Sequence, residues 1–410
     1  MPQQCRLCGA RLCQVLADFG TAPLANRYVR PGEFERGDVL YPLRALVCSA
    51  CVLVQLDTLI PPDVLFADYA YFSSYSETLL SAARTYVATM VERLSLGPGD
   101  SVVEIASNDG YLLRHFGGTG VAVLGIEPAA NVARVAADQG IPTVDRFFGA
   151  DTARELVRDH PRPRLIVANN VLAHVPDPHD FVEGMRLLLA PGGLATIEFH
   201  HLLHLVADCQ FDAIYHEHLQ YYSLAAARTL LEAHGLAVVD VEALPLQNGS
   251  LRVHARHAGD SAARVSSRVA GALAAEDAAG LRRPETYQTF GDRMLATRLA
   301  LLSFLVDARR AGRSVVGYGA AAKGTMLFSH CGIRSDLVEY VVDRSPHKQG
   351  SLMPGSRVLI CDPSRVMDTR PAYLLILPWN LRDEIVAQMS AIRAWGGRFV
   401  LPLPTLQILP

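Results

Sequence analysis

The sequence predicts an α/β protein with a central doubly wound sheet, a small N-terminal metal-binding module and a second α/β domain at the C-terminal end. Three observations predict this fold class. Short apolar runs alternate with helical segments between residues 101 and 241, which is typical of a parallel sheet covered by helices on both faces. A second strand–turn–helix series begins near residue 314. Five of the eight cysteines fall within the first 51 residues.

Composition excludes several classes of protein. Of the 410 residues, 50% are apolar and 19% are charged, which supplies material for packed cores and excludes a wholly disordered chain. The formal net charge is −3, so we expect no nucleic-acid partner. No apolar run approaches the ~20 residues that span a bilayer, and the first residues lack a basic-then-apolar leader. We therefore expect a cytoplasmic protein outside the membrane.

The N-terminal cysteines form two pairs. Cys5-x-x-Cys8 and Cys48-x-x-Cys51 each place two thiolates on one tight turn. Together they supply the four soft ligands that tetrahedral zinc prefers. The alternatives are two disulfides or unrelated thiols of the core. The missing secretory leader is an argument against them. The pattern predicts a structural zinc site that is closed to chemistry.

Turn residues and helical periods divide the chain into three expected units. A helical period over 77–94 ends at the breaker Gly97-Pro98-Gly99. A longer helical stretch over 261–312 precedes the last strand–turn–helix series. We expect a zinc-binding module with its linker over 1–75, a central domain over 76–255 and a C-terminal domain over 256–410.

The elements of the two α/β domains follow in order along the chain. Short apolar runs bounded by polar turns predict buried strands, and apolar residues three or four apart predict helices. In the central domain the strands are expected over 102–105, 121–126, 165–168, 194–199 and 237–241, and the helices over 129–139, 181–189 and 223–234. In the C-terminal domain the strands are expected over 314–319, 338–342, 373–377 and 398–401.

The turn after the first central strand indicates a cofactor. It contains one glycine, Gly110, and lacks the G-x-G-x-x-G that brings a pyrophosphate to a helix N-terminus. Glu127 ends the second strand, where a carboxylate can accept hydrogen bonds from both hydroxyls of a ribose. A nucleoside without phosphates suits this turn, and S-adenosylmethionine is such a nucleoside. A generic α/β domain and a dinucleotide enzyme are the alternatives.

The cofactor is expected to lie along the carboxyl ends of the central strands. The expected contacts are Glu104, Ala106, Asn108, Asp109, Gly110, Tyr111, Glu127, Pro128, Phe148, Asn169 and Asn170. Turn formation or capping is the alternative role of the two asparagines that end the third strand.

Histidines concentrate after the third and fourth central strands. Six of the fourteen lie within 45 residues, namely His174, His200, His201, His204, His216 and His218. Histidine suits proton transfer near neutral pH. Tyr215 and Glu217 flank this group and can orient His218 or hold a developing oxyanion. A metal cluster and an accidental histidine-rich surface are the alternatives.

The motifs and their order resemble the bacterial C-methyltransferases that branch nucleotide-linked 4-keto deoxysugars in antibiotic pathways. The resemblance covers essentially the whole chain and includes both cysteine pairs, the 104–110 turn, 169–174, Tyr215-His216-Glu217-His218, Gly317 to Gly324, Lys348-Gln349-Gly350 and Pro378-Trp379-Asn380-Leu381. It implies a class I S-adenosylmethionine methyltransferase domain, a structural zinc module, and a Rossmann-like C-terminal domain that helps to hold the nucleotide diphosphate, thymidine diphosphate by resemblance.

The resemblance also implies roles for individual residues. His218 is similar to the base that removes the proton beside the ketone, at carbon 3 of the sugar. His174 and Tyr215 look like partners of the enolate oxygen, with Glu217 supporting the site. Contacts with the substrate are expected from His200, His201, Asn248, Lys323 and Trp379.

Three positions bear on how closely the family pattern applies. Either Tyr69 or Tyr71 is similar to a tyrosine that closes over the active site in relatives. His200 stands where relatives carry proline, and Asn248-Gly249-Ser250 stands where two glycines are usual. Because the last two departures lie near the expected sugar pocket, they bear on which sugar is used and which carbon is methylated.

The C-terminal domain carries an alternative function. Gly317-x-Gly319-x-x-Ala322 follows a strand, and Asp343 closes the next one, which is a dinucleotide fingerprint when read alone. An NAD-dependent nucleotide-sugar oxidoreductase is therefore the alternative, whereas the resemblance favours a cofactor-free module. Lys323 can meet a phosphate at the start of the helix, and a solvated surface lysine is the alternative. A nucleic-acid-binding zinc ribbon is disfavoured by the net charge. We expect a monomer.

Overall fold

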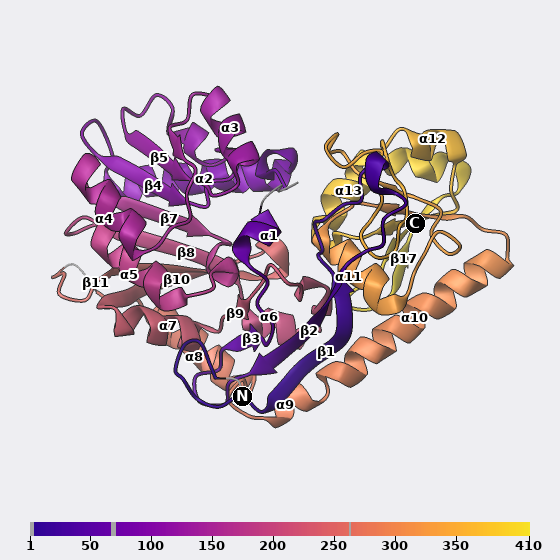
Figure 1. Ribbon diagram of the computed structural model, residues 1–410, viewed down its shortest axis with the longest axis horizontal. Helices are drawn as coiled ribbons and strands as arrows, with labels where there is room; N and C mark the ends of the chain where they lie inside the picture. The colour runs from indigo at the N-terminus through magenta and orange to yellow at the C-terminus, as the bar shows by residue number, and fades with distance from the viewer. Residues whose placement is uncertain (1–3, 67–70, 262–263) are drawn as a thin grey trace.

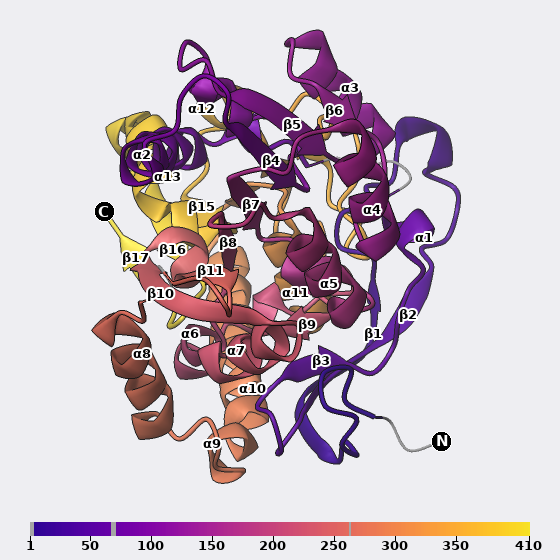
Figure 2. The same ribbon diagram turned by 90° about the vertical axis from the view of Figure 1, so that its left-hand side faces the viewer.

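The computed structural model describes residues 4–66, 71–261 and 264–410. Figure 1 shows the central domain and the C-terminal domain on opposite sides of the molecule, with the N-terminal strands running between them. Figure 2 shows the same arrangement from the side of the central domain. Within the described residues, no helix combines the length and the apolar character needed to cross a membrane.

The N-terminal module is built on an antiparallel sheet. Its strands are β1 (Gln14–Pro23), β2 (Leu40–Val47) and β3 (Val54–Leu56), and the last strand, β9 (Gln220–Tyr221), comes from the central part of the chain. These strands were not predicted from the sequence. Since β3 pairs with β9, the module is tied directly to the segment that carries His218.

A short connection joins the module to the central domain. It contains η1 (Pro31–Glu33), α1 (Pro62–Phe66), η2 (Ser73–Tyr75) and α2 (Glu77–Leu94). The helix α2 has the bounds that its periodicity predicted. It begins where the Ser76 side chain accepts a hydrogen bond from Leu79 N and ends at Ser95 in a left-handed conformation, which are ordinary helix-capping devices.

The central sheet has the strand order β10-β11-β8-β7-β4-β5-β6. Parallel pairing joins β4 (Ser101–Ile105), β5 (Ala122–Ile126), β6 (Thr143–Val144), β7 (Leu165–Asn169) and β8 (Leu194–His200). The other strands, β10 (Leu236–Leu244) and β11 (Ser250–His257), form an antiparallel hairpin on β8. The expectation of a wholly parallel sheet is therefore wrong at this edge, because a short turn can join only antiparallel neighbours.

Helices cover both faces of the central sheet. The elements are η3 (Leu113–Phe116), α3 (Ala130–Asp138), α4 (Ala150–Asp159), η4 (Leu172–His174), α5 (Pro178–Leu188), α6 (Leu202–Ala207), η5 (Phe211–Ala213), α7 (Leu224–Ala233) and η6 (Leu246–Asn248). Alternate residues of each strand enter different cores: Val103 and Ile166 pack with α5 and α7, whereas Val102 and Leu165 pack with α2. This alternation explains why the strands read as continuous apolar runs.

Three helices lead to the C-terminal domain, namely α8 (Ser267–Ala278), α9 (Glu285–Gln288) and α10 (Phe290–Arg310). Helix α8 packs against β10 of the central domain. Helix α10 then runs along the molecule beneath the N-terminal strands and reaches the C-terminal domain (Figure 1). The helical stretch thus connects the two α/β domains.

The C-terminal sheet has the order β14-β13-β12-β15-β16-β17. The pairs are parallel except for β16 with β17. The elements are β12 (Val315–Tyr318), α11 (Ala322–Cys331), β13 (Val341–Val342), β14 (Ile360–Cys361), α12 (Arg365–Thr369), β15 (Tyr373–Ile376), η7 (Trp379–Leu381), α13 (Arg382–Gln388), η8 (Ser390–Trp395), β16 (Arg398–Leu401) and β17 (Gln407–Leu409). The loops after β12 and β15 place α11 and η7 against the central domain.

Candidate active site and metal centre

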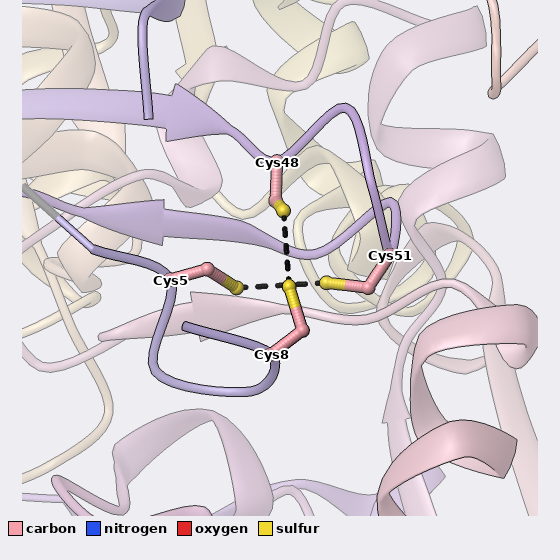
Figure 3. A group of neighbouring side chains, drawn as sticks. All are labelled: Cys5, Cys8, Cys48 and Cys51. Carbon is pink, nitrogen blue, oxygen red and sulfur yellow. Dashed lines mark hydrogen bonds between the residues drawn. The ribbon is translucent and has the colours of Figure 1, made fainter. Parts of the chain in front are cut away.

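Four cysteine thiols meet in the N-terminal module. Their sulfur atoms all lie within 4.8 Å of one another, and the residues are Cys5, Cys8, Cys48 and Cys51. Figure 3 shows them converging from two turns, with Cys5 facing Cys51 and Cys8 facing Cys48, each pair 3.5 Å apart at Sγ. That separation is far longer than the ~2.05 Å of a disulfide. It suits tetrahedral zinc, which holds each thiolate at about 2.3 Å. The zinc prediction fits, and the disulfide alternative is wrong.

Each cysteine pair is folded by the same local turn. Gly9 N donates to Cys5 O, and Val52 N donates to Cys48 O, both at 2.9 Å. Gly9 (φ 73°) and Val52 (φ 62°) are both left-handed, so each turn reverses directly after its second thiol. The hydrogen bond between Cys5 and Cys51 lowers the pKa of Cys5 and raises that of Cys51, so one thiol of this pair is readily ionised and the other needs the metal to lose its proton.

Glu127, the predicted ribose-binding carboxylate, lies at the end of β5 beside the turn that follows β4. Asn108 N donates to its Oε2 at 3.0 Å, and Ala129 N donates to its Oε1 at 2.9 Å. Burial raises the pKa of Glu127 to about 7. Each oxygen keeps a further lone pair, so the carboxylate can still accept hydrogen bonds from two hydroxyl groups.

The turn after β4 has an unusual backbone. Ala106, Asn108 and Gly110 have φ angles of 57°, 51° and 73°. A Cβ atom at Gly110 would lie 2.3 Å from Ile141 Cδ1, the movable end of that side chain, so the positive φ is the main reason for glycine there. The single glycine of this turn is therefore explained by its backbone conformation.

Several buried polar atoms near this turn have no hydrogen-bond partner among the described residues. They include both carboxylate oxygens of Glu104, Ser107 Oγ and Asp109 Oδ1. Burial raises the pKa of Glu104 well above its usual range, and the charges of Asp109 and Glu127 raise it further. A buried polar atom without a partner is costly, and the amino and hydroxyl groups of S-adenosylmethionine are donors of the kind missing here. The site fits this cofactor.

Two further predicted cofactor residues lie at the end of β7. Asn169 is the last residue of this strand and lies beside Tyr111. Burial raises the pKa of Tyr111 well above its usual range, and the charge of Glu104 raises it further. Asn170 N donates to Glu198 O at 2.7 Å, which ties the end of β7 to β8. These side chains border the same strand ends as the turn after β4.

The last two predicted cofactor residues are placed differently. Pro128 follows Glu127 directly and is half-buried. Phe148 packs edge-on against Phe181 of α5, with ring centroids 5.4 Å apart. Since this contact belongs to the apolar core, the cofactor contact of Phe148 stays a prediction.

The linker before α2 lies over the cofactor turn. Ser73 N donates to Asn108 Oδ1 at 2.8 Å, and Asn108 Nδ2 donates to Tyr71 O at 3.1 Å. The main chain at Tyr71 is therefore fixed beside the turn. Tyr69, the other tyrosine that could close the site, lies outside the described residues.

His218 has a defined tautomer. Its Nδ1 lies 3.0 Å from Ala213 O, and a carbonyl only accepts, so Nδ1 carries the proton and Nε2 holds a lone pair in the neutral ring. The Tyr215 hydroxyl lies 2.8 Å from Nε2, and the two rings are 4.0 Å apart. Burial lowers the pKa of His218 well below its usual value, and His174 lowers it further. The ring is therefore neutral at pH 7.

His174 and Glu217 adjoin this pair. The His174 ring lies 4.9 Å from His218 at 74°, and burial lowers the pKa of His174 to about 4. Glu217 is 2% exposed, and burial raises its pKa to about 7. Asn26 Nδ2 donates to Glu217 Oε2 at 2.7 Å. The structure thus brings the predicted catalytic residues of the central domain together, and it adds Asn26, which carried no local sequence signal.

The remaining histidines of the rich stretch have other partners. His201 Nε2 lies 2.6 Å from Glu276 Oε1 on α8, and Glu276 also accepts from Leu224 N at the start of α7. His216 Nε2 donates to Pro42 O at 3.1 Å. His201 is thus engaged in a buried structural link, which does not support its predicted substrate contact. The four-cysteine group is the one arrangement of metal ligands among the described residues, so the histidine metal cluster is wrong.

A second polar group surrounds His200 at the end of β8. Lys323 Nζ lies 5.7 Å from the ring centroid of Trp379, and Trp379 Nε1 donates to Asp212 Oδ2 at 2.8 Å. Burial lowers the pKa of His200 to about 3, and the charge of Lys323 contributes. Residues of α11 and η7 thereby meet residues of the central domain.

This group contains buried atoms that lack hydrogen-bond partners among the described residues. They are Asp212 Oδ1, Asn248 Nδ2, Ser250 Oγ and Lys323 Nζ. Gln210 Nε2 donates to Asn248 O at 3.0 Å. Donors and acceptors together suit the hydroxyl groups of a sugar, each of which can donate and accept. Gln210 and Asp212 were not predicted from the sequence. Their position in the chain, just before the predicted catalytic residues 215–218, is the sequence feature that could have pointed to them.

The glycine turn of the C-terminal domain is filled by protein groups. A Cβ atom at Gly319 would lie 2.4 Å from Pro378 Cδ. Lys348 Nζ donates to Ala320 O at 2.8 Å and lies 3.5 Å from Asp343 Oδ2. The glycine therefore serves close packing, and the carboxylate that a ribose would need already faces a lysine. The turn favours the cofactor-free module over the dinucleotide alternative.

Three family models match successive parts of the chain. A zinc-binding domain matches residues 5–66, a methyltransferase domain matches residues 79–241, and a C-methyltransferase C-terminal domain matches residues 245–404. Together these matches span the module, the central sheet and the C-terminal sheet.

Sequence relatives agree with these matches. C-methyltransferase NovU of Streptomyces niveus is 37% identical over 406 residues, which cover 99% of this chain and 96% of that protein. An uncharacterized methyltransferase of Mycobacterium leprae is 25% identical over 154 residues, or 36% of this chain and 57% of that protein. Among solved structures, magnesium protoporphyrin IX methyltransferase of Synechocystis PCC 6803 with bound S-adenosylmethionine is 14% identical and covers 43% of this chain and 78% of its own, with a TM-score of 0.33.

Proposed function

Because this chain belongs to the C-methyltransferase family, we propose that it methylates a carbon beside the ketone of a nucleotide-linked 4-keto deoxysugar. It is an S-adenosylmethionine-dependent enzyme with a structural zinc site. The observation that carries the proposal is the neutral His218, whose Nε2 holds a lone pair within a partly buried group of Tyr215, His174 and Glu217.

Proton abstraction is the first step of the proposed reaction. The bond between hydrogen and the carbon beside the ketone breaks, the proton moves to His218 Nε2, and the electron pair moves onto the ketone oxygen as an enolate. Burial supports this role because it keeps the ring unprotonated at neutral pH. S-adenosylmethionine, held by Glu127 and the turn after β4, would supply the electrophilic methyl group for the enolate carbon, with its methyl–sulfur bond breaking to leave S-adenosylhomocysteine.

The enolate oxygen needs hydrogen-bond donors. The Tyr215 hydroxyl lies 2.8 Å from His218 Nε2. This hydroxyl must turn away before the nitrogen can accept a proton from the substrate. Turning brings a hydroxyl donor to the oxygen at the moment its charge develops. His174 is the second proposed donor, and Glu217 supports both from behind. The linker tyrosine, Tyr69 or Tyr71, is proposed to cover the bound substrate.

The polar group around His200 is the proposed sugar site. Asn248 and Asp212 supply buried hydrogen-bonding atoms, and Trp379 supplies an aromatic face. Lys323 supplies a positive charge for an anionic part of the substrate. We propose thymidine diphosphate as the nucleotide and carbon 3 as the site of methylation, on the strength of the family resemblance.

The wider setting follows the same resemblance. We propose that the enzyme acts in the biosynthesis of deoxysugars for natural products such as antibiotics. We further propose that it works in the cytoplasm as a monomer, with the three units folded on one another.

The decisive experiment is turnover of a defined substrate. The protein is incubated with S-adenosylmethionine and a thymidine diphosphate-linked 4-keto-6-deoxyhexose, and the product is examined by mass spectrometry and NMR. We expect a gain of one methylene unit in mass and a new methyl group on the carbon beside the ketone. Methylation on oxygen, or no methylation of any nucleotide-linked 4-keto sugar, would contradict the proposal.

A further inference from the structure

The residues directly after β1 connect all three parts of the molecule. This strap, Leu24–Val29, leaves the N-terminal sheet and enters the space between the two α/β domains, where Figure 1 shows the N-terminal strands passing between them. Ala25 and Tyr28 of the strap are 0% and 8% exposed. The zinc-binding module therefore sends a buried segment toward the candidate active site.

One side of the strap holds the C-terminal domain. Thr325 Oγ1 of α11 donates to Ala25 O at 3.0 Å, and the Tyr28 hydroxyl donates to Ala320 O at 2.5 Å. Val29 and Leu352 exchange two backbone hydrogen bonds of 3.0 and 2.8 Å. These contacts fix the strap against the turn that follows β12.

The other side of the strap holds Glu217. Asn26 Nδ2 donates to Glu217 Oε2 at 2.7 Å, and the Asn26 backbone adds a second hydrogen bond to the same carboxylate. The Glu217 backbone in turn hydrogen-bonds to His174, whose ring lies 4.9 Å from His218. A continuous chain of contacts thus runs from the zinc-binding module to the proposed base.

We infer that Asn26 is a positioning residue of the active site, through which the zinc-binding module holds Glu217 and His174 against His218. The inference rests on the proposed function, because it takes the roles of Glu217 and His218 from there. It assigns the module a part in the reaction besides its structural role.

The chemistry of the contact gives it a pH signature. Burial raises the pKa of Glu217 to about 7, and the two hydrogen bonds from Asn26 oppose that rise. The titratable groups that face Glu217 are Tyr28 on the strap, His174 on η4 and Tyr221 on β9. Since burial keeps both tyrosines and this histidine uncharged at pH 7, loss of the Asn26 donor raises the pKa of Glu217 further.

The test measures proton removal by itself. With S-adenosylhomocysteine bound, the full-length protein exchanges hydrogen for deuterium at the carbon beside the ketone of a thymidine diphosphate-linked 4-keto-6-deoxyhexose in D2O. Asn26→Leu keeps about the size of the side chain and loses its N–H donors without adding a charge beside Glu217, and Asn26→Ser is a second variant. Arg27→Ala, on the exposed neighbour in the strap, is the matched control.

We expect both Asn26 variants to exchange about 10- to 100-fold more slowly, the range that loss of a hydrogen bond to a buried charged group implies. The acidic limb of the rate profile should move to higher pH, while zinc content and S-adenosylhomocysteine binding stay unchanged. A merely structural role would leave the position of this limb unmoved. Arg27→Ala should match the wild type.

Two results separate the inference from the proposed function. If Glu217→Gln slows exchange but a zinc-loaded Asn26→Leu or Asn26→Ser variant exchanges at the wild-type rate with an unmoved pH limb, the inference is overturned and the proposed function stands. If Glu217→Gln and His218→Asn both exchange normally, the proposed function fails first.

Discussion

Replacement of His218 by asparagine is the sharpest test of the proposed chemistry. The His218 ring makes two hydrogen bonds, from Nδ1 to Ala213 O and between Nε2 and the Tyr215 hydroxyl. The amide nitrogen of asparagine lies close to the place of Nδ1, so the bond to Ala213 O can be kept. The variant thus loses the basic Nε2 alone, and the local fold should survive.

The expected loss follows from the role of a positioned base. A general base contributes about 10²- to 10⁴-fold to a rate, which is about 2.7 to 5.4 kcal/mol of activation free energy. We expect a loss within this range, because burial keeps the His218 ring unprotonated at neutral pH but, by lowering its pKa, also weakens it as a base. Binding of S-adenosylhomocysteine should not change, because the turn after β4 does not involve this side chain.

The assay is deuterium uptake beside the ketone, followed by NMR, together with methyl transfer in a separate reaction. His160→Asn is the matched control, because His160 is exposed at the end of α4. A His218→Asn variant that is zinc-loaded, binds S-adenosylhomocysteine and still exchanges within about threefold of the wild type would refute the assignment of the base.

Four further outcomes are expected. Lys323→Met should raise the KM for the nucleotide sugar about tenfold or more, with unchanged S-adenosylhomocysteine binding by calorimetry, because a buried ammonium is lost. Glu127→Ala should weaken S-adenosylhomocysteine binding about 10- to 100-fold in the same calorimetric assay, and unchanged affinity would exclude this residue from the ribose site. Cys48→Ser should lower the zinc content measured by atomic emission and unfold the module, since structural zinc and folding are coupled. Folding raises the pKa of the Glu217 carboxyl from 4.5 to about 7. The contribution of this carboxyl to the free energy of unfolding is therefore full below pH 4.5 and is lost as the pH rises through 7. The Glu217→Gln variant should thus become more stable relative to the wild type as the pH rises from 4.5 to 7. By linkage the change in relative stability over this pH range reaches about 3 kcal/mol. The measurement is the urea midpoint of each protein at pH 5 and at pH 7.5, and a difference between the two proteins that is the same at both pH values would contradict the prediction.

The zinc site shows what can be predicted from the local sequence alone. Each Cys-x-x-Cys pair forms its own turn, closed by a hydrogen bond to the carbonyl of its first cysteine, so spacing and residue type were enough to predict the ligands. Helix α2 is similar, because its period and its capping serine at position 76 are local features. The parallel strands β4, β5, β7 and β8 were found for the same reason, as continuous apolar runs, whereas the two-residue strands β6 and β14 were not predicted.

Other elements depend on distant partners. Strand β3 has only three residues and gains its second neighbour from β9, far along the chain, so no local pattern marks it as a strand. The hairpin of β10 and β11 joins the parallel sheet through β8. Pairing direction is a property of the assembled sheet, and the alternation of strands and helices could not predict this edge.

The candidate site divides in the same way. Tyr215, Glu217 and His218 are neighbours in sequence, and their residue types alone suggest proton transfer. Asn26 reaches Glu217 across 191 positions of sequence, and Asp212 meets Trp379 across 167. A contact of this length has no sequence period, so neither Asn26 nor Asp212 could be identified from its surroundings in the chain.

The sequence by itself determined the kinds of chemistry available: four thiolates for zinc, a carboxylate at the end of a strand, and imidazoles for proton transfer. Only the tertiary structure decided which histidines have the burial and hydrogen-bond partners that the proposed base needs. His201 is drawn into a pair with Glu276, whereas His218 is left with a lone pair on Nε2. The reason is that basicity and accessibility depend on burial and on hydrogen-bond partners, which come from segments far apart in the chain.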